Sequence, residues 1–316
     1  GLHQRLACRD PIRARHSKCH EAASARCSQA NLLRSSRNSA HVGVVIMQIT
    51  HRISIASSPD IQRELAALGI AVPDTGFVSF DVAESNKAWP ALEQWIAHRR
   101  AVEVASTKFS KRELSDALWL ELVPDWHHGY PQPDEDAFGY RRATFDLSDW
   151  CGHCGIGMKQ KAPFQMKGEP KWGKKSILQL NWIFDEYFVT PDAWSDVFKP
   201  HGIECRPVRN TKGVDLKSVV QLVAHKEVAV VAHGLATEDA ACSRCGRTKY
   251  LPVARGRFPA LTEQPSTAMV KTSEYFGSGA AAHRRVLVSK AVAHSLTASK
   301  IRGASLRPLA QRRSES

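Results

Sequence analysis

Residues 151–155 read CGHCG, and residues 242–246 repeat the pattern as CSRCG. Each C-x-x-C pair places two thiols on one tight turn, and the glycine after the second cysteine tolerates the positive φ that lets the chain turn away. Four thiolates form a complete coordination shell for a structural, tetrahedral Zn²⁺. We therefore predict one structural zinc ion with four ligands, Cys151, Cys154, Cys242 and Cys245.

The distance between the two pairs differs from that of a zinc ribbon, in which about 15–20 residues separate them. Here 87 residues lie between Cys154 and Cys242. Closing the longer loop costs only about 1.4 kcal/mol more, because closure entropy grows with the logarithm of length. A structural zinc contributes about 10–16 kcal/mol. The intervening segment can therefore be a folded insertion whose ends meet at the metal.

Three rival interpretations of the cysteines remain open beside one shared zinc ion. Residues 150–154, WCGHC, look like the active-site motif of protein disulfide isomerases, which would make Cys151 and Cys154 a thiol-disulfide oxidoreductase site. That chemistry needs the first cysteine at a helix N-terminus, and the sequence GIG at 155–157 favours helix poorly. The second rival is disulfide bonding. The third is two separate metal sites completed by histidines, for which the candidates are His127, His128 and His233.

The charge of the chain is unevenly distributed. The 316 residues carry a net charge of +13, and residues 1–46 hold eight Lys and Arg against two acidic residues. This segment lacks a hydrophobic period, so we predict a disordered basic extension upstream of a functional protein that starts at Met47; an organelle transit peptide is the alternative.

The sequence predicts no membrane-spanning helix, because it contains no run of 18 apolar residues. The paired C-x-x-C motifs, with Cys205 left over, favour the reducing cytoplasm.

Residues 47–145 alternate between strand and helix patterns and predict a smaller N-terminal α/β segment. Strands are expected at 49–55, 77–82 and 102–104, and helices at 58–68 and 89–100. Ser58 followed by Pro59 is a typical helix start. Ser110 and Glu113 form a predicted capping box that opens a further helix through residue 122.

The proline-rich loop at 124–133 carries aromatic and histidine side chains of the kind found at binding surfaces. A catalytic site would need an oriented partner, and the sequence offers none, so we expect a non-catalytic protein. The candidate partner-binding residues of this loop are Trp126, His127, His128 and Tyr130.

A basic segment follows the first C-x-x-C pair and suggests a second function, nucleic-acid binding. Lysines near aromatic residues can contact phosphates while the rings stack on bases. The candidate contact residues are Lys159, Lys161, Lys167, Lys171, Trp172, Lys174 and Lys175. The alternative is a solvated loop whose apolar members pack on the core.

A strand-helix-strand pattern occurs twice after residue 146. The first copy enters a helix at 191–198, turns at Gly202 and leaves through 203–208; the second enters a helix at 290–299, turns at Gly303 and leaves through 304–309. Thr190 and Ser289 are the expected N-caps. We predict an α+β fold in which residues 146–310 form a zinc-bridged domain with a duplicated unit, followed by a tail at 311–316.

The two CXXCG motifs about ninety residues apart, together with the ending VLVS (286–289) and IRGASLRP (301–308), resemble the double-CXXCG immunity proteins. Those proteins accompany contact-delivered bacterial toxins and protect the producing cell. The resemblance covers roughly residues 146–309. It implies a non-catalytic cytoplasmic protein that holds zinc through the four cysteines and binds and neutralises a partner toxin.

Overall fold

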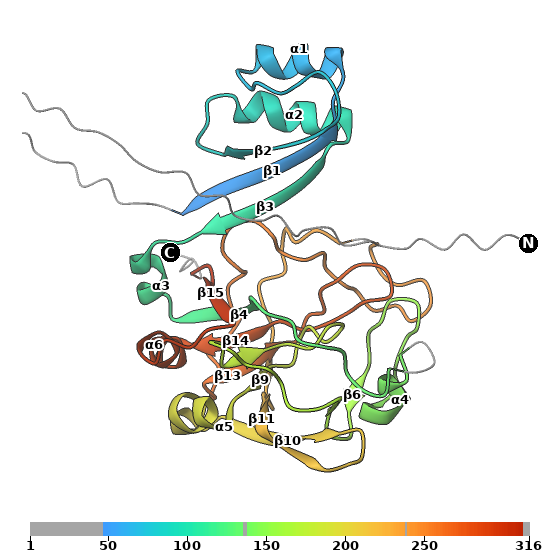
Figure 1. The fold of residues 1–316 in the computed structure, drawn as a ribbon, viewed down its shortest axis with the longest axis vertical. Helices are drawn as coiled ribbons and strands as arrows, with labels where there is room; N and C mark the ends of the chain where they lie inside the picture. Colours follow the sequence, from blue (N-terminus) through green and yellow to red (C-terminus); the bar gives the residue numbers. More distant parts are fainter. Residues whose placement is uncertain (1–46, 135–137, 238, 312–316) are drawn as a thin grey trace, which may run out of the picture. The chain divides into compact units, whose positions relative to one another are not determined.

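The computed structural model describes residues 47–134, 138–237 and 239–311. Helices and strands are mixed along the chain, which confirms the predicted α+β class (Figure 1). The expectations for residues 1–46 and for the tail at 312–316 lie outside the described residues. No helix in the described part of the chain combines the length and apolar character needed to cross a membrane.

A three-stranded antiparallel sheet in the order β2-β1-β3 begins the fold. Its elements are β1 (Gln48–Ala56), α1 (Pro59–Ala67), β2 (Phe77–Ala83), α2 (Trp89–Arg99) and β3 (Val102–Lys108). The two helices cover one face of the sheet (Figure 1), where Ile53, Leu65 and Leu92 form a buried cluster. The Ser58 hydroxyl accepts the amide hydrogen of Ile61, as the predicted N-cap requires.

The predicted capping box at Ser110 is present, but the helix that it opens is short. Ser110 Oγ accepts from the Glu113 amide, and the Glu113 carboxylate accepts from the Ser110 amide. The helix α3 (Lys111–Asp116) ends well before the predicted residue 122, because the chain continues as the strand β4 (Trp119–Pro124). Four consecutive residues of β4, from Trp119 to Leu122, are buried, so packing on both faces of a sheet overrides the helical pattern.

Two five-stranded sheets form the rest of the fold. The first, in the order β7-β10-β11-β9-β8, contains β7 (Gln165–Met166), β8 (Ile177–Leu178), β9 (Phe188–Val189), β10 (Glu204–Asn210) and β11 (Asp215–Val223). The second, in the order β12-β13-β14-β4-β15, contains β12 (Glu227–Val228), β13 (Met269–Thr272), β14 (Val286–Ser289), β4 and β15 (Ala304–Pro308). A short helix α4 (Tyr140–Thr144) and the two-stranded pair β5 (Phe145–Asp146) and β6 (Lys159–Gln160) flank the first C-x-x-C motif.

The predicted duplication is present as β9-helix-β10 and β14-α6-β15, where α6 spans Lys290–Ala298. We call residues 151–210 the first repeat and residues 242–308 the second repeat. Thr190 and Ser289 cap their helices through side-chain oxygens that accept the amide hydrogen three residues on. Gly202 and Gly303 end the helical segments with φ of +73° and +111°, a conformation that favours glycine.

The helix of the first repeat is less regular than predicted. It consists of α5 (Pro191–Ala193), a π-helical turn η1 (Trp194–Phe198) and a 3₁₀ turn η2 (Lys199–His201). Pro200 lacks an amide hydrogen, and its ring clashes with the preceding helical turn, so regular α-helix cannot continue past it. The second repeat has no proline in α6, which is a regular helix.

The two repeats exchange their central strands. In the first sheet β11 lies between β10 and β9, antiparallel to both, and in the second sheet β4 lies between β15 and β14 in the same way. Yet β4 precedes the first C-x-x-C motif, and β11 precedes the second. Each strand that leads into one repeat is therefore the centre of the other repeat's sheet.

The strand registers confirm that β4 and β11 are equivalent. Leu120 of β4 pairs with Val288 and Pro308, and Val220 of β11 pairs with Val189 and Pro207. These partners occupy corresponding places in the two repeats, immediately before the N-cap and in the Arg-Pro pair. The duplication therefore includes the central strand.

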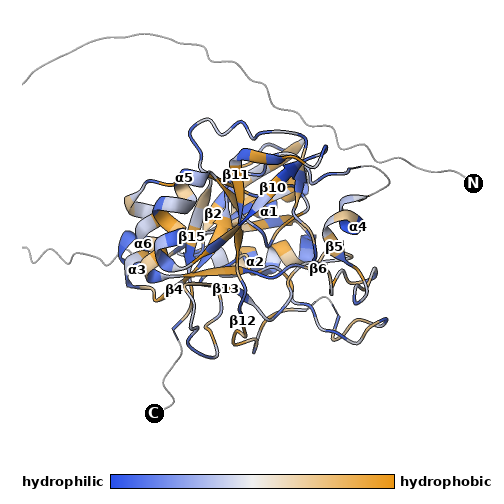
Figure 2. Cartoon of the chain, turned by 90° about the horizontal axis from the view of Figure 1, so that it is seen from below, coloured by the Kyte–Doolittle hydropathy of each residue, from blue (hydrophilic) through white to orange (hydrophobic). Residues whose placement is uncertain are grey.

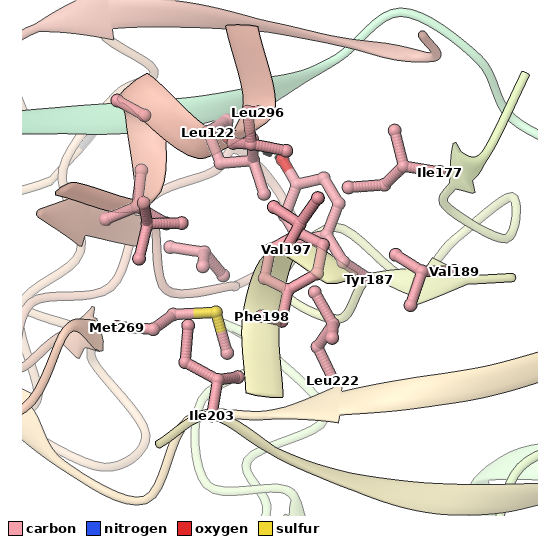
Figure 3. Packing of buried hydrophobic residues seen from close by; sticks show 14 of the residues in the cluster. Leu122, Ile177, Tyr187, Val189, Val197, Phe198, Ile203, Leu222, Met269 and Leu296 are labelled. Carbon is pink, nitrogen blue, oxygen red and sulfur yellow. Dashed lines mark hydrogen bonds between the residues drawn. The ribbon is translucent and has the colours of Figure 1, made fainter. Parts of the chain in front are cut away.

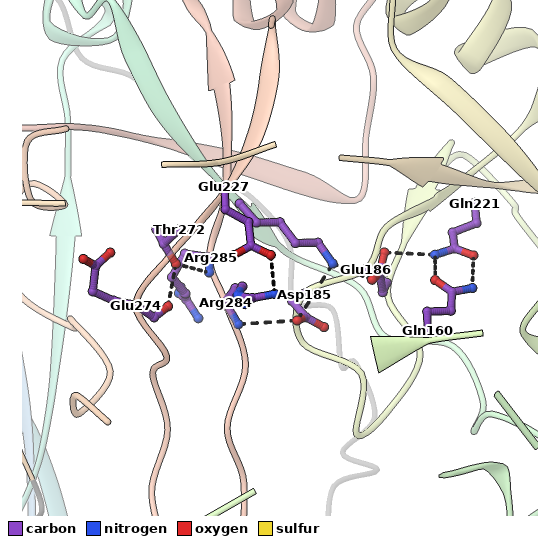
Figure 4. A network of polar contacts seen from close by, with 10 residues as sticks. Gln160, Asp185, Glu186, Gln221, Glu227, Thr272, Glu274, Arg284 and Arg285 are labelled. Carbon is purple, nitrogen blue, oxygen red and sulfur yellow. Dashed lines mark hydrogen bonds and ion pairs between the residues drawn. The ribbon is translucent and has the colours of Figure 1, made fainter. Parts of the chain in front are cut away.

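A buried polar residue follows at the next position of each central strand. Glu121 is 0% exposed and pairs with Arg285, while Gln221 is 1% exposed and donates from Nε2 to Glu186 Oε2 at 2.9 Å. Arg285 and Glu186 each lie four residues before their N-cap, and Figure 4 shows both in a network of polar contacts. Lys271 pairs with Glu186. Arg285 and Glu186 thus occupy equivalent positions with opposite charges. Arg285 satisfies the buried Glu121 of β4, and Glu186 satisfies the buried Gln221 of β11.

The main hydrophobic core draws on both repeats (Figure 3). Val197 and Phe198 from the first helix pack with Leu296 from α6, and Leu122 and Leu222 from the central strands complete the cluster. The Tyr187 hydroxyl donates to the Leu122 carbonyl, which ties the first repeat to β4. Hydrophobic residues run along β4 and β11 (Figure 2). Because the core and the central strands are shared, we infer that neither repeat is an independent folding unit.

Strand pairing divides the chain at a different place from the predicted segments 47–145 and 146–310. Residues 119–124 belong by sequence to the predicted N-terminal segment, but β4 pairs with β14 and β15 of the second repeat. The three-stranded sheet with its own core ends at residue 108. The cause is the exchange of central strands, which sends the strand before the first C-x-x-C motif into the far repeat.

Candidate metal centre

The two C-x-x-C motifs form the same turn. The amide of Gly155 donates to the Cys151 carbonyl at 2.8 Å, and the amide of Gly246 donates to the Cys242 carbonyl at 2.8 Å. Both glycines have positive φ, +84° and +70°. The identical hydrogen bonds direct both thiols of each turn to one side.

The turns meet with all four sulfurs together. Cys151 Sγ lies 3.9 Å from Cys242 Sγ, Cys154 Sγ lies 3.6 Å from Cys245 Sγ, and all four sulfurs lie within 4.8 Å of one another. These distances exceed the roughly 2.05 Å of a disulfide bond. Sulfurs about 2.3 Å from a tetrahedral ion lie about 3.8 Å apart. The four predicted ligands can therefore hold one metal ion, and they come two from each repeat.

The arrangement of the cysteines bears on the interpretations that the sequence leaves open. In the described part of the chain these four cysteines are the one group of histidine, cysteine and acidic side chains close enough to hold an ion, so two separate histidine-completed sites are not formed. The five cysteines in the described ranges, including Cys205, are free thiols. Residues 152–157 form turns without helix, so Cys151 does not lie at a helix N-terminus of the kind expected for a disulfide isomerase motif.

Two basic residues that sequence analysis did not single out lie next to the sulfurs. Arg247 Nε is 3.4 Å from Cys245 Sγ, and its other nitrogens donate to the Asp149 carboxylate and carbonyl at 3.0 and 2.8 Å. The guanidinium lowers the pKa of Cys245 to about 6, while burial raises the pKa of Cys154 to about 12. Lys249 Nζ donates to the carbonyl oxygen of Cys154 at 3.1 Å. The signal in the sequence is RTK, which directly follows the second motif.

The charge of these residues suits a thiolate site. Four thiolates around a divalent ion carry a net charge of about −2. Arg247 and Lys249 supply two positive charges beside it, and Lys249 is 8% exposed. Outer hydrogen bonds of this kind fix ligand orientation and stabilise the anionic centre.

The glycines after the two motifs allow a matched test of how tightly the turns are packed. An alanine Cβ at Gly155 would lie 2.4 Å from the Ala280 carbonyl oxygen, whereas one at Gly246 would meet nothing within 4 Å. Gly246→Ala should lower the free energy of unfolding by about 1–2 kcal/mol, through left-handed strain alone. Gly155→Ala should cost about 1–3 kcal/mol more, because the backbone must move. Urea unfolding of both variants measures the difference, and equal losses would contradict the packing of the first turn.

The predicted partner-binding loop is divided between core and surface. Trp126 packs on a second hydrophobic cluster and lies 5.2 Å from the ring of His128. Burial lowers the pKa of His128. Tyr130 is 46% exposed and its ring lies 4.4 Å from that of Trp182, while the exposed His127 lies 6.4 Å from the ring of Phe184. The outer part of the loop thus continues into aromatic residues at 182–184.

The lysine-rich segment presents charge without free aromatic rings. Five of its lysines are exposed, namely Lys159, Lys161, Lys167, Lys171 and Lys174. Lys167 pairs with Asp134, and Lys175 lies 4.5 Å above the Trp126 ring. Phe164 is fully buried, and Trp172 packs on the same cluster while its Nε1 donates to the Ser218 carbonyl. The aromatic residues that base stacking would need are therefore engaged in the fold.

Comparison with known proteins adds no family. A scan of family models and searches of curated proteins and of solved structures find no match to this chain.

Proposed function

We propose that the chain is a non-catalytic zinc-binding protein that binds and neutralises a partner toxin in the bacterial cytoplasm. The observation that carries the proposal is the meeting of four sulfurs from two repeats, with spacings of 3.6 and 3.9 Å across the repeats. Zinc acts here as a joint between the repeats and takes part in no reaction.

The donor set supports zinc and a structural role. Tetrahedral sites with four sulfurs are typical of zinc or of iron–sulfur centres. A single ion with four thiolates has no open position for water or substrate, which is the mark of a structural site. Neutralising a toxin requires a binding surface and no chemistry, and the exposed side chains around Tyr130 and Trp182 offer one. The resemblance of the paired CXXCG motifs to immunity proteins supports the same role.

Metal analysis of the full chain tests the zinc site. We expect one zinc ion per chain in the purified protein and no visible colour. Cys245→Ser should lose the ion, whereas Cys205→Ser should keep it, because Cys205 lies outside the cluster. Stoichiometric iron with visible absorbance, or a protein that binds no metal in its folded state, would contradict the proposal.

A protection assay tests the partner. The proposal predicts a toxin gene beside the gene for this chain; the full chain should then restore growth of cells that express this toxin, and the two proteins should co-purify. Tyr130→Ala should weaken the complex by about tenfold, as interface aromatics commonly do. Phe77→Ala removes an aromatic ring that is 72% exposed on β2 and should leave the complex unchanged. Absence of protection, or turnover of the toxin by this chain, would refute the role.

A further inference from the structure

A pocket of about 370 Å³ opens beside the aromatic residues at 182–184. Its walls come from both repeats and from the segment before the first motif. They include the aromatic residues Phe138, Tyr140, Trp182, Phe184 and Tyr275. Binding pockets for small ligands measure about 300–1,000 Å³ and are mostly apolar with a few placed polar groups.

Two of the aromatic walls are held in a conformation that bulky residues rarely adopt. Phe138 has φ of +83° and Trp182 has φ of +68°, although neither is glycine. Left-handed conformations cost about 1–2 kcal/mol for an ordinary residue, and such strain gathers at functional sites. The Trp182 ring is fixed against Phe138 at 4.7 Å and Tyr130 at 4.4 Å, yet the residue is 41% exposed. The ring contacts therefore hold Trp182 in a strained conformation that leaves part of its aromatic surface open at the pocket.

Some nitrogen atoms in the pocket have no hydrogen-bond partner among the described residues. Three buried nitrogen atoms of lining residues find no hydrogen-bond partner in the described ranges: Arg141 Nε, His283 Nδ1 and Arg284 Nε. His283 Nε2 lies 3.2 Å from an Arg285 nitrogen, which can only donate. The imidazole proton is therefore on Nδ1, and this nitrogen is an unsatisfied donor.

The charges point the same way. Arg141 lies over the rings of Phe138 and Trp150 and pairs with no carboxylate among the described residues. Arg284 Nη1 pairs with Glu227 at 2.7 Å (Figure 4), and the guanidinium lies 4.5 Å from the centre of the Tyr275 ring. Asp185 also lines the pocket, and its Oδ2 lies 3.9 Å from Lys271 Nζ and 3.4 Å from the Arg284 amide nitrogen. Arg141 Nε and His283 Nδ1 thus remain without an acceptor among the described residues.

We propose that this pocket binds a carboxylate carried on an aromatic or similarly planar apolar group. Arg141 and His283 Nδ1 are the donors to the carboxylate, and the rings of Trp182 and Phe184 contact the apolar group. Hydrogen bonds to a charged acceptor satisfy the buried donors, and ring contacts at the entrance provide geometric selectivity. The ligand is either a free aromatic acid or the C-terminal residue of a peptide. The assignment goes beyond the proposed toxin binding and does not depend on it.

Matched model compounds test this site on the full chain. N-acetyl-L-phenylalanine carries the carboxylate, and N-acetyl-L-phenylalaninamide is its neutral control. We expect the acid to bind with a Kd of about 1 mM or lower and the amide at least about tenfold more weakly, measured by calorimetry and saturation-transfer NMR. Phenylacetate and the peptide acetyl-Gly-Gly-Phe with a free C-terminus identify the source. Tighter binding of phenylacetate indicates a free acid, and tighter binding of the peptide indicates a chain terminus.

Two variants separate binding from folding. Trp182→Gly removes the ring contacts with Phe138 and Tyr130 but relieves the positive φ, so the variant should stay folded with a lower thermal unfolding midpoint while binding of the acid falls at least about tenfold. Arg141→Gln should reduce the preference for acid over amide and leave the midpoint within a few degrees. Phe77→Ala, outside the pocket, should alter neither. Equal binding of acid and amide, no binding at about 10 mM, or unchanged binding by folded Trp182→Gly would overturn the assignment.

Discussion

Cys242→Ser is expected to unfold both five-stranded sheets together. Removing one of four thiolates opens the coordination shell, and a structural zinc contributes about 10–16 kcal/mol to folding. The whole stability of a domain is only about 5–15 kcal/mol. The ion joins the two repeats, and the central strands β4 and β11 are exchanged between them. We therefore expect both sheets to lose their hydrophobic core when the ion is lost.

Hydrogen exchange followed by mass spectrometry, together with thermal unfolding, measures this effect. In Cys242→Ser, and in the wild type after treatment with a strong chelator, protection should be lost in β10, β11, β13 and β14 alike. Cys205→Ser is the matched control, since Cys205 is a free thiol in β10 away from the other sulfurs. Loss of protection in one sheet alone would show that the repeats fold independently.

The metal site and the local signals around it can be predicted from sequence because each depends on nearby residues. A C-x-x-C turn places its sulfurs through hydrogen bonds within five residues, and the N-caps at Ser58, Thr190 and Ser289 each act over three. The duplication is visible because both copies keep an N-cap, a glycine turn and an Arg-Pro pair. These features need no knowledge of which segments meet in space.

The exchange of central strands cannot be predicted in this way because it depends on pairing between distant segments. The strand β4 and the last five residues of β11, 219–223, both carry apolar residues around one polar residue, so hydrophobic pattern alone does not assign either strand to its sheet. Ser110 with its capping box predicts a helix through residue 122, but burial of Trp119 and Leu120 in a sheet outweighs local preference. The choice is made by tertiary packing.

The pocket is predictable only in part. The aromatic residues Trp126 and Tyr130 indicate a binding surface in the sequence, and the Tyr130 ring does lie against the Trp182 ring. Nothing in the sequence at Trp182 indicates a left-handed conformation, which is usually marked by glycine or asparagine. Nor does it show that His283 and Arg141, far apart along the chain, line one cavity. Such features arise from the way the two repeats meet.

Glu121→Gln is expected to cost about 3–5 kcal/mol of unfolding free energy, although glutamine nearly matches glutamate in shape. Glu121 is 0% exposed in the middle of β4, paired with Arg285, and its second oxygen lies 3.4 Å from Arg307. Removing the carboxylate charge leaves two largely buried guanidinium groups without a counter-ion. Burial already lowers the pKa of Arg307, as expected for a charge with little contact with water.

The control for this prediction is the ion pair of the neighbouring arginine. Glu227 pairs with Arg284, which precedes Arg285 in the chain, but the Glu227 side chain is 45% exposed. Glu227→Gln should therefore change stability by about 0–1 kcal/mol, as for other solvated pairs. Urea unfolding of both variants gives the comparison, and a loss below about 1 kcal/mol for Glu121→Gln would contradict a charge-dependent core.

Replacing all three charges separates the need for a counter-ion from the need for the charges themselves. Apolar residues of similar volume in place of a buried charge cluster are commonly neutral or stabilising, because no ion then requires desolvation. Glu121→Leu combined with Arg285→Met and Arg307→Met should therefore recover most of the stability that Glu121→Gln loses. Recovery would place the cost in the unpaired guanidinium groups. If the triple variant is as unstable as Glu121→Gln, the network instead holds β4 in its register between β14 and β15, and the charges specify which central strand each sheet accepts.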